Sequence, residues 1–145
     1  MLCIFTSVVI LFLLFLIADI ILYLIFAFAL FNMAKDKNIE NFWMAWIPIL
    51  QLYILGRLIE SLKILDYEIP QIELVFPLFG VAAIILNKVM ILGTILSLLY
   101  FIFTLIVLNK LYKIYDEDKA TVFTILSIFG FPVPFIFMYL KDIKN

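Results

Sequence analysis

Residues 1–34 read MLCIFTSVVILFLLFLIADIILYLIFAFALFNMA, a stretch with one charged side chain, Asp19, and with neither glycine nor proline. An α-helix rises 1.5 Å per residue, so about 20 apolar residues cross the roughly 30 Å hydrocarbon layer of a membrane. This stretch exceeds that length. We therefore expect the chain to begin inside a lipid bilayer.

The same stretch can be read as a secretion signal, because Ala27-Phe28-Ala29 resembles a cleavage site. However, no basic residue precedes the apolar run, and the run is far longer than the roughly 7–15 apolar residues of a signal. Nothing resembling a processed leader stands before Cys3, which argues against lipidation. We expect a permanent membrane span.

The composition supports a membrane protein over the whole chain. Hydrophobic residues make up 68% of the 145 residues and charged residues 14%, whereas soluble domains have about 45–50% and about 25%. A small water-soluble fold cannot bury so much apolar surface. We predict one integral membrane domain, residues 1–145, with the lipid bilayer as its surroundings.

Charge and residue types argue against several functions. The formal net charge is −1 and no basic stripe exists, so no nucleic-acid partner is expected. A single cysteine excludes an internal disulfide and a cysteine-based metal site. The absence of histidine removes the commonest metal ligand and the usual general base. We expect neither an enzyme nor a bound cofactor.

Polar and proline-containing stretches divide the rest of the chain into apolar segments. Residues 42–62, 89–108 and 120–140 are long enough to cross a membrane, whereas residues 74–86 are short for a straight span. We predict an all-α, polytopic transmembrane helical bundle with proline-broken helices. It would have four full spans plus one short or re-entrant segment, and five crossings are the alternative.

With four crossings, the orientation in the membrane is poorly determined. Apart from Lys88, the Lys and Arg residues divide five to four between the two sides. Acidic residues contribute little to orientation, so this split hardly biases insertion. We favour a bacterial cytoplasmic (plasma) membrane location with the N-terminus outside.

Proline lies at the centre of three apolar stretches, residues 46–50, 75–79 and 131–135. Proline-interrupted segments in corresponding positions indicate a transporter-like binding site, where unwound backbone lines a cavity. Proline is also frequent in membrane helices, where it packs as a kink. Both interpretations stay open.

Asp19 is the most suggestive polar residue. An ionisable group inside a membrane is costly unless it is paired, hydrated or protonated. Asp19 is a candidate ion or proton site, with Arg57 or Lys88 as a possible counter-charge. The alternatives are a neutral Asp19 that hydrogen-bonds a neighbouring helix, or a helix register that places it nearer one membrane surface.

Four further residues complete the candidate intramembrane polar site. Arg57, Glu60 and Lys63 are spaced i, i+3 and i+6, which favours an ion ladder along one helix flank. The alternative is a contact with a substrate or a lipid headgroup. Lys88 lies either at an interface turn or in a buried pair with Asp19. The candidate site is Asp19, Gln51, Arg57, Glu60 and Lys88.

Several short stretches carry a resemblance. They are Met33-Ala34-Lys35, residues 43–49 (WMAWIPI), Tyr53-Ile54-Leu55-Gly56, residues 111–116 (LYKIYD) and Pro134-Phe135-Ile136. Together they resemble uncharacterised small multi-pass membrane proteins of Gram-positive bacteria with an "MAK…W.AWIPI…Y.LG" signature. The likeness covers most of the chain after about residue 30, although Gln51 stands where that pattern has Asn. It implies a membrane architecture and no particular activity.

Two functional hypotheses follow. The first is an accessory or interaction subunit that packs against another membrane protein or forms a homo-oligomer, because no catalytic set of residues exists. The second is a minimal oligomeric transporter or channel, in which Asp19 and the proline-broken helices line the route.

Overall fold

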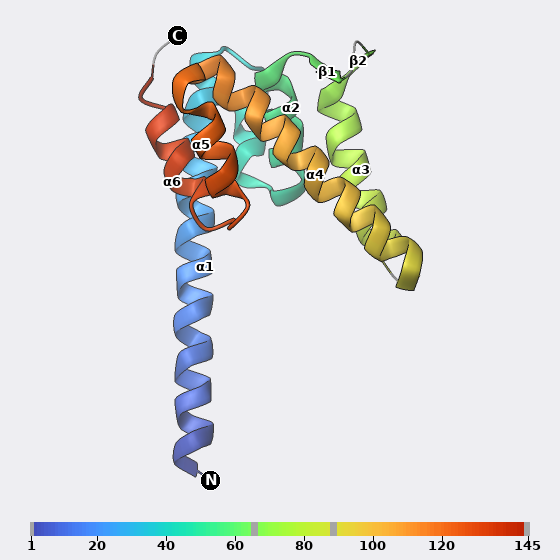
Figure 1. Cartoon of the computed structure of the whole chain (residues 1–145). Helices are drawn as coiled ribbons and strands as arrows, with labels where there is room; N and C mark the ends of the chain where they lie inside the picture. Colours follow the sequence, from blue (N-terminus) through green and yellow to red (C-terminus); the bar gives the residue numbers. More distant parts are fainter. Residues whose placement is uncertain (1, 65–66, 88–89, 144–145) are drawn as a thin grey trace.

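A computed structural model describes residues 2–64, 67–87 and 90–143, and its fold is all-α, as the sequence predicts (Figure 1). A two-stranded hairpin is the only sheet in these ranges. In chain order the elements are α1 (Leu2–Asp36), the 3-10 helix η1 (Phe42–Trp46), α2 (Pro48–Ile59), β1 (Leu62–Ile64), β2 (Tyr67–Ile69), α3 (Ile72–Leu86), α4 (Met90–Tyr115), α5 (Glu117–Ser127) and α6 (Val133–Leu140).

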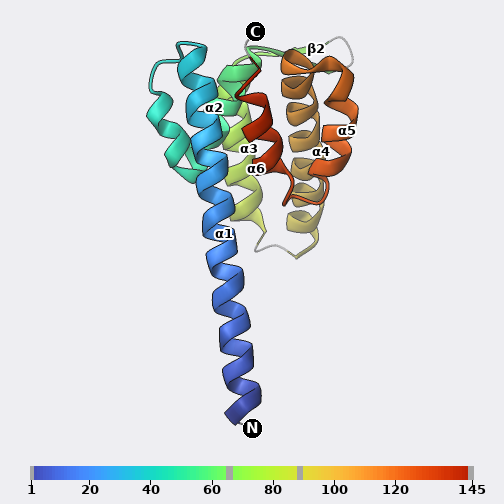
Figure 2. The same ribbon diagram turned by 90° about the vertical axis from the view of Figure 1, so that its left-hand side faces the viewer.

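Helix α1 is a single straight helix whose two halves have different surroundings (Figure 2). It has no glycine or proline, the usual causes of a kink. The second half packs on the other helices and buries Ala27, Leu30 and Met33. Residues 5–18, which we call the free half of α1, are exposed throughout and extend beyond the rest of the molecule.

The full crossing expected over residues 42–62 is not supported, although the break expected at Pro48 is present. After α1 the chain turns back through η1, and Ile47 is extended, with φ −111° and ψ 120°. Pro48 occupies the first turn of α2, where its missing N–H has no intrahelical partner to lose. At the other end, the Lys37 and Glu60 side chains lie 3.9 Å apart. The segment therefore folds into a hairpin whose two ends lie together.

The full crossing expected over residues 120–140 is not supported either, although its glycine and prolines do break the helix. Helices α5 and α6 are separated by residues 128–132, where Gly130 has φ +76°, a conformation that glycine adopts readily. Pro132 caps the start of α6. The Tyr139 hydroxyl donates to Asp116 Oδ2 at 3.2 Å, which joins the far ends of the two helices. This segment is a second hairpin.

Helices α3 and α4 form an antiparallel pair that runs away from the β hairpin and returns (Figures 1 and 2). Helix α3 has 15 residues and is short, as expected for this segment, and Pro77 lies inside it without ending it. Aromatic rings join the pair, with Phe76 stacked on Tyr100 at 5.7 Å between ring centroids.

Two helices, Phe5–Asp36 and Ile91–Tyr115, are long and apolar enough to cross a membrane within the described ranges. The prediction of four full spans is therefore not supported, because the breaks before Pro48 and around Gly130 divide two of the expected spans. The β hairpin was not expected from the sequence. In its antiparallel register, Lys63 lies opposite Glu68 on the neighbouring strand.

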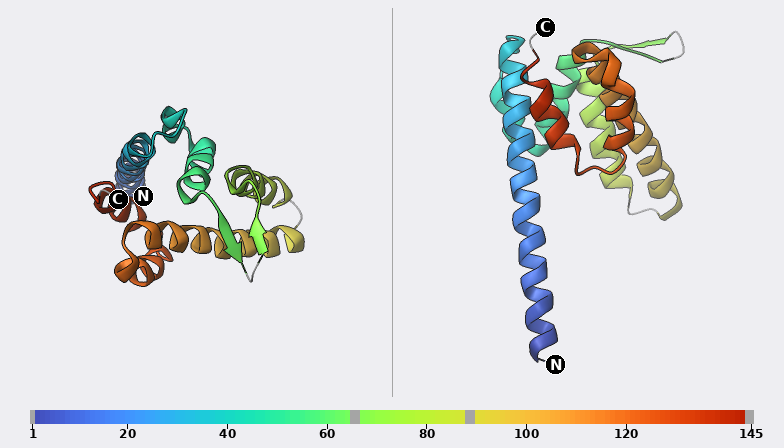
Figure 3. Two further views of the ribbon diagram at one scale, coloured as in Figure 1. Left: turned by 90° about the horizontal axis from the view of Figure 1, so that it is seen from above. Right: turned by 60° about the vertical axis from the view of Figure 1, so that its left-hand side comes forward.

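Charged residues gather at one end of the molecule. The C-terminal ends of α1, α2, α4 and α6 lie there, together with the N-terminal ends of α3 and α5 and the β hairpin (Figures 1 and 3). Apart from Asp19, every charged residue that the structure describes belongs to these helix ends or to the loops that join them. We call this region the charged end.

The hydrophobic core lies near the charged end. There the second half of α1 meets α2, α4 and α6, and α3 adds Ile72 and Phe76. Between α4 and α5, the buried Tyr112 hydroxyl and Ser127 Oγ lie 2.8 Å apart in a hydrogen bond. Away from this core, large apolar side chains on α1, α3 and α4 are exposed.

A close approach of two helices yields the first prediction. A Cβ atom at Gly56 would lie 2.8 Å from Glu73 N and closer still to its Cα, whereas a Cβ at Gly80 would meet the outer atoms of the Tyr100 ring. Overpacking costs about 1–3 kcal/mol, and Gly→Ala inside a helix gains about 1 kcal/mol. We expect Gly56→Ala to lower the thermal unfolding temperature by several degrees, because the backbone of Glu73 cannot move away from the added methyl group as a side chain can.

The matched control for that prediction is Gly80→Ala. Its neighbour is a side chain that can shift, so we expect a change within about 1 kcal/mol of unfolding free energy. Circular dichroism of the purified chain in detergent measures both variants. An equal loss in the two variants would contradict the close contact between α2 and α3.

Candidate functional site

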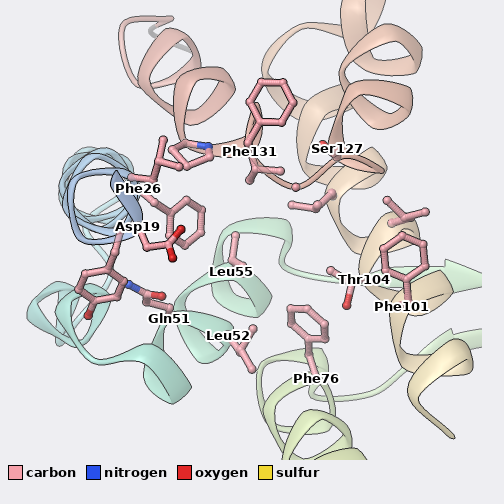
Figure 4. A pocket seen from close by; sticks show the side chains of 17 residues that line it. Asp19, Phe26, Gln51, Leu52, Leu55, Phe76, Phe101, Thr104, Ser127 and Phe131 are labelled. Carbon is pink, nitrogen blue, oxygen red and sulfur yellow. The ribbon is translucent and has the colours of Figure 1, made fainter. Parts of the chain in front are cut away.

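A cavity of about 580 Å³ lies among the helices, and it is open on one side rather than enclosed (Figure 4). Seen from above, α1, α2 and α3 form an arc and α4 runs along the opposite side (Figure 3). All four helices contribute to the cavity, as do α5, α6 and the loop between them. Its lining is Asp19, Leu22, Tyr23, Phe26, Gln51, Leu52, Leu55, Phe76, Phe101, Thr104, Leu105, Leu108, Ser127, Gly130, Phe131, Val133 and Pro134.

Helix α1 presents one face to the cavity. Asp19, Tyr23 and Phe26 are spaced i, i+4 and i+7, which places them along a single helical face. The Tyr23 hydroxyl donates a hydrogen bond to the Trp46 carbonyl at the end of η1. This bond attaches the turn of the first hairpin to α1 at the edge of the cavity.

Gln51 lies in the first turn of α2 and is buried. Its side-chain Nε2 donates to the Ala45 carbonyl at 2.8 Å, which closes the turn between η1 and α2. The predicted site residue Gln51 therefore borders the cavity and also holds the break that Pro48 begins.

The turn of the second hairpin borders the same cavity through Gly130, Phe131 and Pro134. Of the three proline-centred stretches, residues 131–135 and 75–79 contribute lining residues, among them Phe131 and Phe76. No residue of 46–50 lines the cavity, but helix α2, which Pro48 begins, borders it through Gln51. The stretch around Pro77 remains inside a continuous helix. This convergence agrees with the expectation that interrupted helices line a cavity.

The hydroxyl groups in the lining are already engaged. Thr104 Oγ1 donates to the Tyr100 carbonyl at 2.9 Å within α4. Ser127 Oγ donates to the Phe123 carbonyl at 2.8 Å and also bonds the Tyr112 hydroxyl. The walls therefore offer mainly apolar and aromatic surface.

Asp19 is the one charged group in the cavity lining. Its side chain is exposed, and in Figure 4 the carboxylate points into the space between the helices. Among the described residues it has no hydrogen-bond or ion-pair partner. The cavity thus carries a single negative group at its rim.

The expected counter-charge Arg57 does not lie beside Asp19. Arg57 Nη1 is 3.9 Å from Glu73 Oε1, and both line a separate cleft of about 280 Å³ at the charged end. Glu60 lines the same cleft and pairs with Lys37. The predicted ladder through Arg57, Glu60 and Lys63 is wrong, because α2 ends at Ile59 and Lys63 belongs to β1.

These ion pairs contribute little to stability. Both are 3.9 Å long and involve exposed side chains, and such pairs are worth about 0–1 kcal/mol.

Lys88, the last of the predicted site residues, lies outside the described residues. The five predicted site residues are therefore divided between the cavity (Asp19 and Gln51), the cleft (Arg57 and Glu60) and the part of the chain that is not described.

A third polar cluster joins α5 to α6 at the charged end. Asp116 caps α5 by accepting from the Lys119 amide at 3.2 Å. Removal from water opposes ionisation of Asp116, but hydrogen bonds from the Lys119 amide and side chain hold its pKa below the usual value. The hydrogen bond to the Tyr139 hydroxyl raises the pKa of Lys119. The cluster fastens the second hairpin and takes no part in the cavity.

Sequence reasoning missed the aromatic lining on α1 and α4, including Tyr23 and Phe101, and reached Phe131 only as part of the proline-centred stretch 131–135. These residues come from three distant segments, and no local pattern connects them. Gly130, followed by two prolines, was the available signal, since it marks a turn that brings Phe131 to the cavity.

No protein-family model, curated protein or solved structure matches this chain. The resemblance to small multi-pass membrane proteins of Gram-positive bacteria stays a prediction.

Proposed function

We propose that this chain is a multi-pass integral protein of the bacterial cytoplasmic membrane that works as an accessory subunit. In this proposal the free half of α1 packs against a helix of another membrane protein. The observation that carries the proposal is that residues 5–18 are apolar, exposed on every side and separate from the rest of the molecule.

The charged end suggests how the chain would lie in the bilayer. We place this end at one membrane surface, with α1, α3 and α4 extending through the hydrocarbon layer and the two proline-broken hairpins entering and leaving on the same side. All Lys and Arg residues that the structure describes are then on that side. The positive-inside rule favours the cytoplasm for it, with the N-terminus outside.

The length of α1 supports a protein partner. Its apolar run, residues 2–34, is about 50 Å long, whereas the hydrocarbon layer is roughly 30 Å thick. A helix with excess length tilts or kinks. Helix α1 has no residue that favours a kink, and its second half is fixed by packing. Residues before about position 15 would project beyond the layer, so an apolar partner surface would stabilise them.

A different protein fits better than a second copy. Two parallel copies would bring their Asp19 carboxylates to the same depth, and like charges repel strongly in a medium of low dielectric constant. A heterologous helix avoids this repulsion.

The cavity favours a second candidate function, a minimal oligomeric transporter or channel. Its support is that both proline-broken hairpins and Asp19 border one space. Loss of flux in reconstituted vesicles on Asp19→Asn, with assembly unchanged, would distinguish this function from that of an accessory subunit.

The proposed membrane placement yields a topology prediction. We expect single cysteines introduced at Glu40, Glu68, Asp118 and Asp142, in a Cys3→Ser chain, to react with a membrane-impermeant maleimide from the same side. These residues are exposed and belong to four different parts of the charged end. Labelling of intact cells and of inverted vesicles measures the side.

A chain with four full crossings would give a different labelling pattern, with the four positions divided between the two sides of the membrane. Positions 40 and 118 would then label from one side, and positions 68 and 142 from the other. Such a split would reject the two re-entrant hairpins.

The partner proposal yields a crosslinking prediction. We expect a photoreactive amino acid at Phe12, in the free half of α1, to crosslink one integral membrane protein in native membranes. The control position is Leu98, an exposed residue of α4. The captured protein should also copurify with the wild-type chain, and Phe12→Ala with Phe15→Ala should weaken this association.

Leu98→Ala with Ile102→Ala is the matched double variant, and it should leave the association unchanged. A crosslinked product of twice the chain's mass would show that the partner is a second copy of this chain and not a different protein. The absence of any product at Phe12 would reject the interaction proposal.

A further inference from the structure

We infer that the cavity is a binding site for a lipophilic organic cation, with Asp19 as its counter-charge. The inference rests on the cavity that also supports the transport alternative, and it does not depend on a partner at the free half of α1.

The size of the cavity suits a small organic molecule. Its volume of about 580 Å³ falls within the roughly 300–1,000 Å³ of typical ligand pockets. Leu55, Phe76 and Leu108 are buried in its interior, whereas Phe101 and Phe131 are exposed at its rim. A ligand can therefore enter from the open side and bury an apolar body against the interior.

The polar side chains of the walls narrow the class of ligand. The Tyr23, Thr104 and Ser127 hydroxyls already donate hydrogen bonds to backbone carbonyls. The Gln51 amide nitrogen does the same. A sugar or a peptide would need many free hydrogen-bonding groups to replace its water, because an unpaired buried polar group is costly. An apolar ligand body meets no such cost.

Asp19 determines the sign of the ligand's charge. Its carboxylate has no counter-charge among the described residues. In the proposed membrane placement Asp19 lies in the hydrocarbon layer, where charge interactions are weakly screened. A cation would compensate the carboxylate, whereas a fatty acid or an anionic lipid would add a like charge. Charge complementarity therefore favours a positively charged ligand.

The aromatic residues give a second reason for a cation. Rings of Tyr23, Phe26, Phe101 and Phe131 come from three parts of the chain to line the cavity, whereas the Phe76 ring is fully buried against Tyr100. The faces of aromatic rings attract cations within about 6 Å, and quaternary cations are recognised by groups of such rings. A cation with aromatic or alkyl substituents would use both the rings and the carboxylate.

The test uses tetraphenylphosphonium as the cation and triphenylphosphine oxide as a neutral analogue of similar shape. The full chain is placed in discs of zwitterionic lipid, so that the lipid carries no net charge, and binding is measured by equilibrium dialysis. We expect saturable binding of the cation and binding of the neutral analogue about ten- to hundredfold weaker, from the loss of the attraction between the cation and the Asp19 carboxylate and aromatic rings.

Asp19→Asn tests the counter-charge with almost no change in side-chain size. Because the charge attraction is lost, we expect it to weaken tetraphenylphosphonium binding about ten- to hundredfold and to leave triphenylphosphine oxide binding unchanged. Glu40→Gln is the matched control, because it removes an exposed carboxylate at the charged end that does not line the cavity. We expect this variant to bind like the wild type.

Two further variants keep the proposal testable if Asp19→Asn does not fold. Asp19→Glu retains the charge and should retain most of the binding. Leu105→Trp adds bulk to the half-buried wall on α4 and should weaken both ligands. Circular dichroism checks the helical content of each variant.

Three results would overturn the inference. They are binding to the wild type that does not saturate, equal affinity for the neutral analogue, and full affinity in either Asp19→Asn or Leu105→Trp. Equal affinity for the two ligands would indicate a site for a neutral lipid chain. Specific cation binding without flux would keep this inference and reject the transport alternative.

Discussion

The arrangement of this chain depends on two interruptions of helical hydrogen bonding. Pro48 has no backbone N–H and begins a helix after an extended residue, and Gly130 adopts a left-handed conformation before Pro132. Each interruption reverses the direction of an apolar segment that could otherwise form a continuous helix. The two reversals bring the ends of both segments back to the charged end, and they place Gln51 of the first hairpin and the turn of the second hairpin at the cavity.

The distribution of charge follows from these reversals. With four straight spans, the Lys and Arg residues would divide almost evenly between two sides. With two hairpins, those that the structure describes gather on one side. In the proposed membrane placement, an orientation that is weakly determined by the linear sequence becomes strongly biased once the segments fold back. The same reversals leave Asp19 as the isolated charge among the described residues.

Part of this fold could be predicted from local sequence. Helix α1 follows from its composition, and the short α3 follows from the thirteen apolar residues between polar ones. The sequence does not predict whether a given proline ends a helix or remains inside one. Pro77 remains within a continuous helix, whereas Pro48 follows a reversal that Gln51 stabilises through the Ala45 carbonyl. These outcomes depend on side-chain and tertiary contacts that hydropathy does not describe. Asp19 could be singled out, but its surroundings come from segments up to 115 residues away, as far as Pro134.

The bond between Tyr23 and Trp46 has a mechanical consequence. The stretch of α1 from Ala27 to Ala34 is tightly packed and holds the second half of the helix in place. A straight helix that is held along one half can pivot as a rigid body about that half. A force on the outer arm would swing Asp19 and Tyr23 together and pull the neighbouring turn with them. The width of the cavity entrance would then depend on the position of the partner that binds the free half of α1.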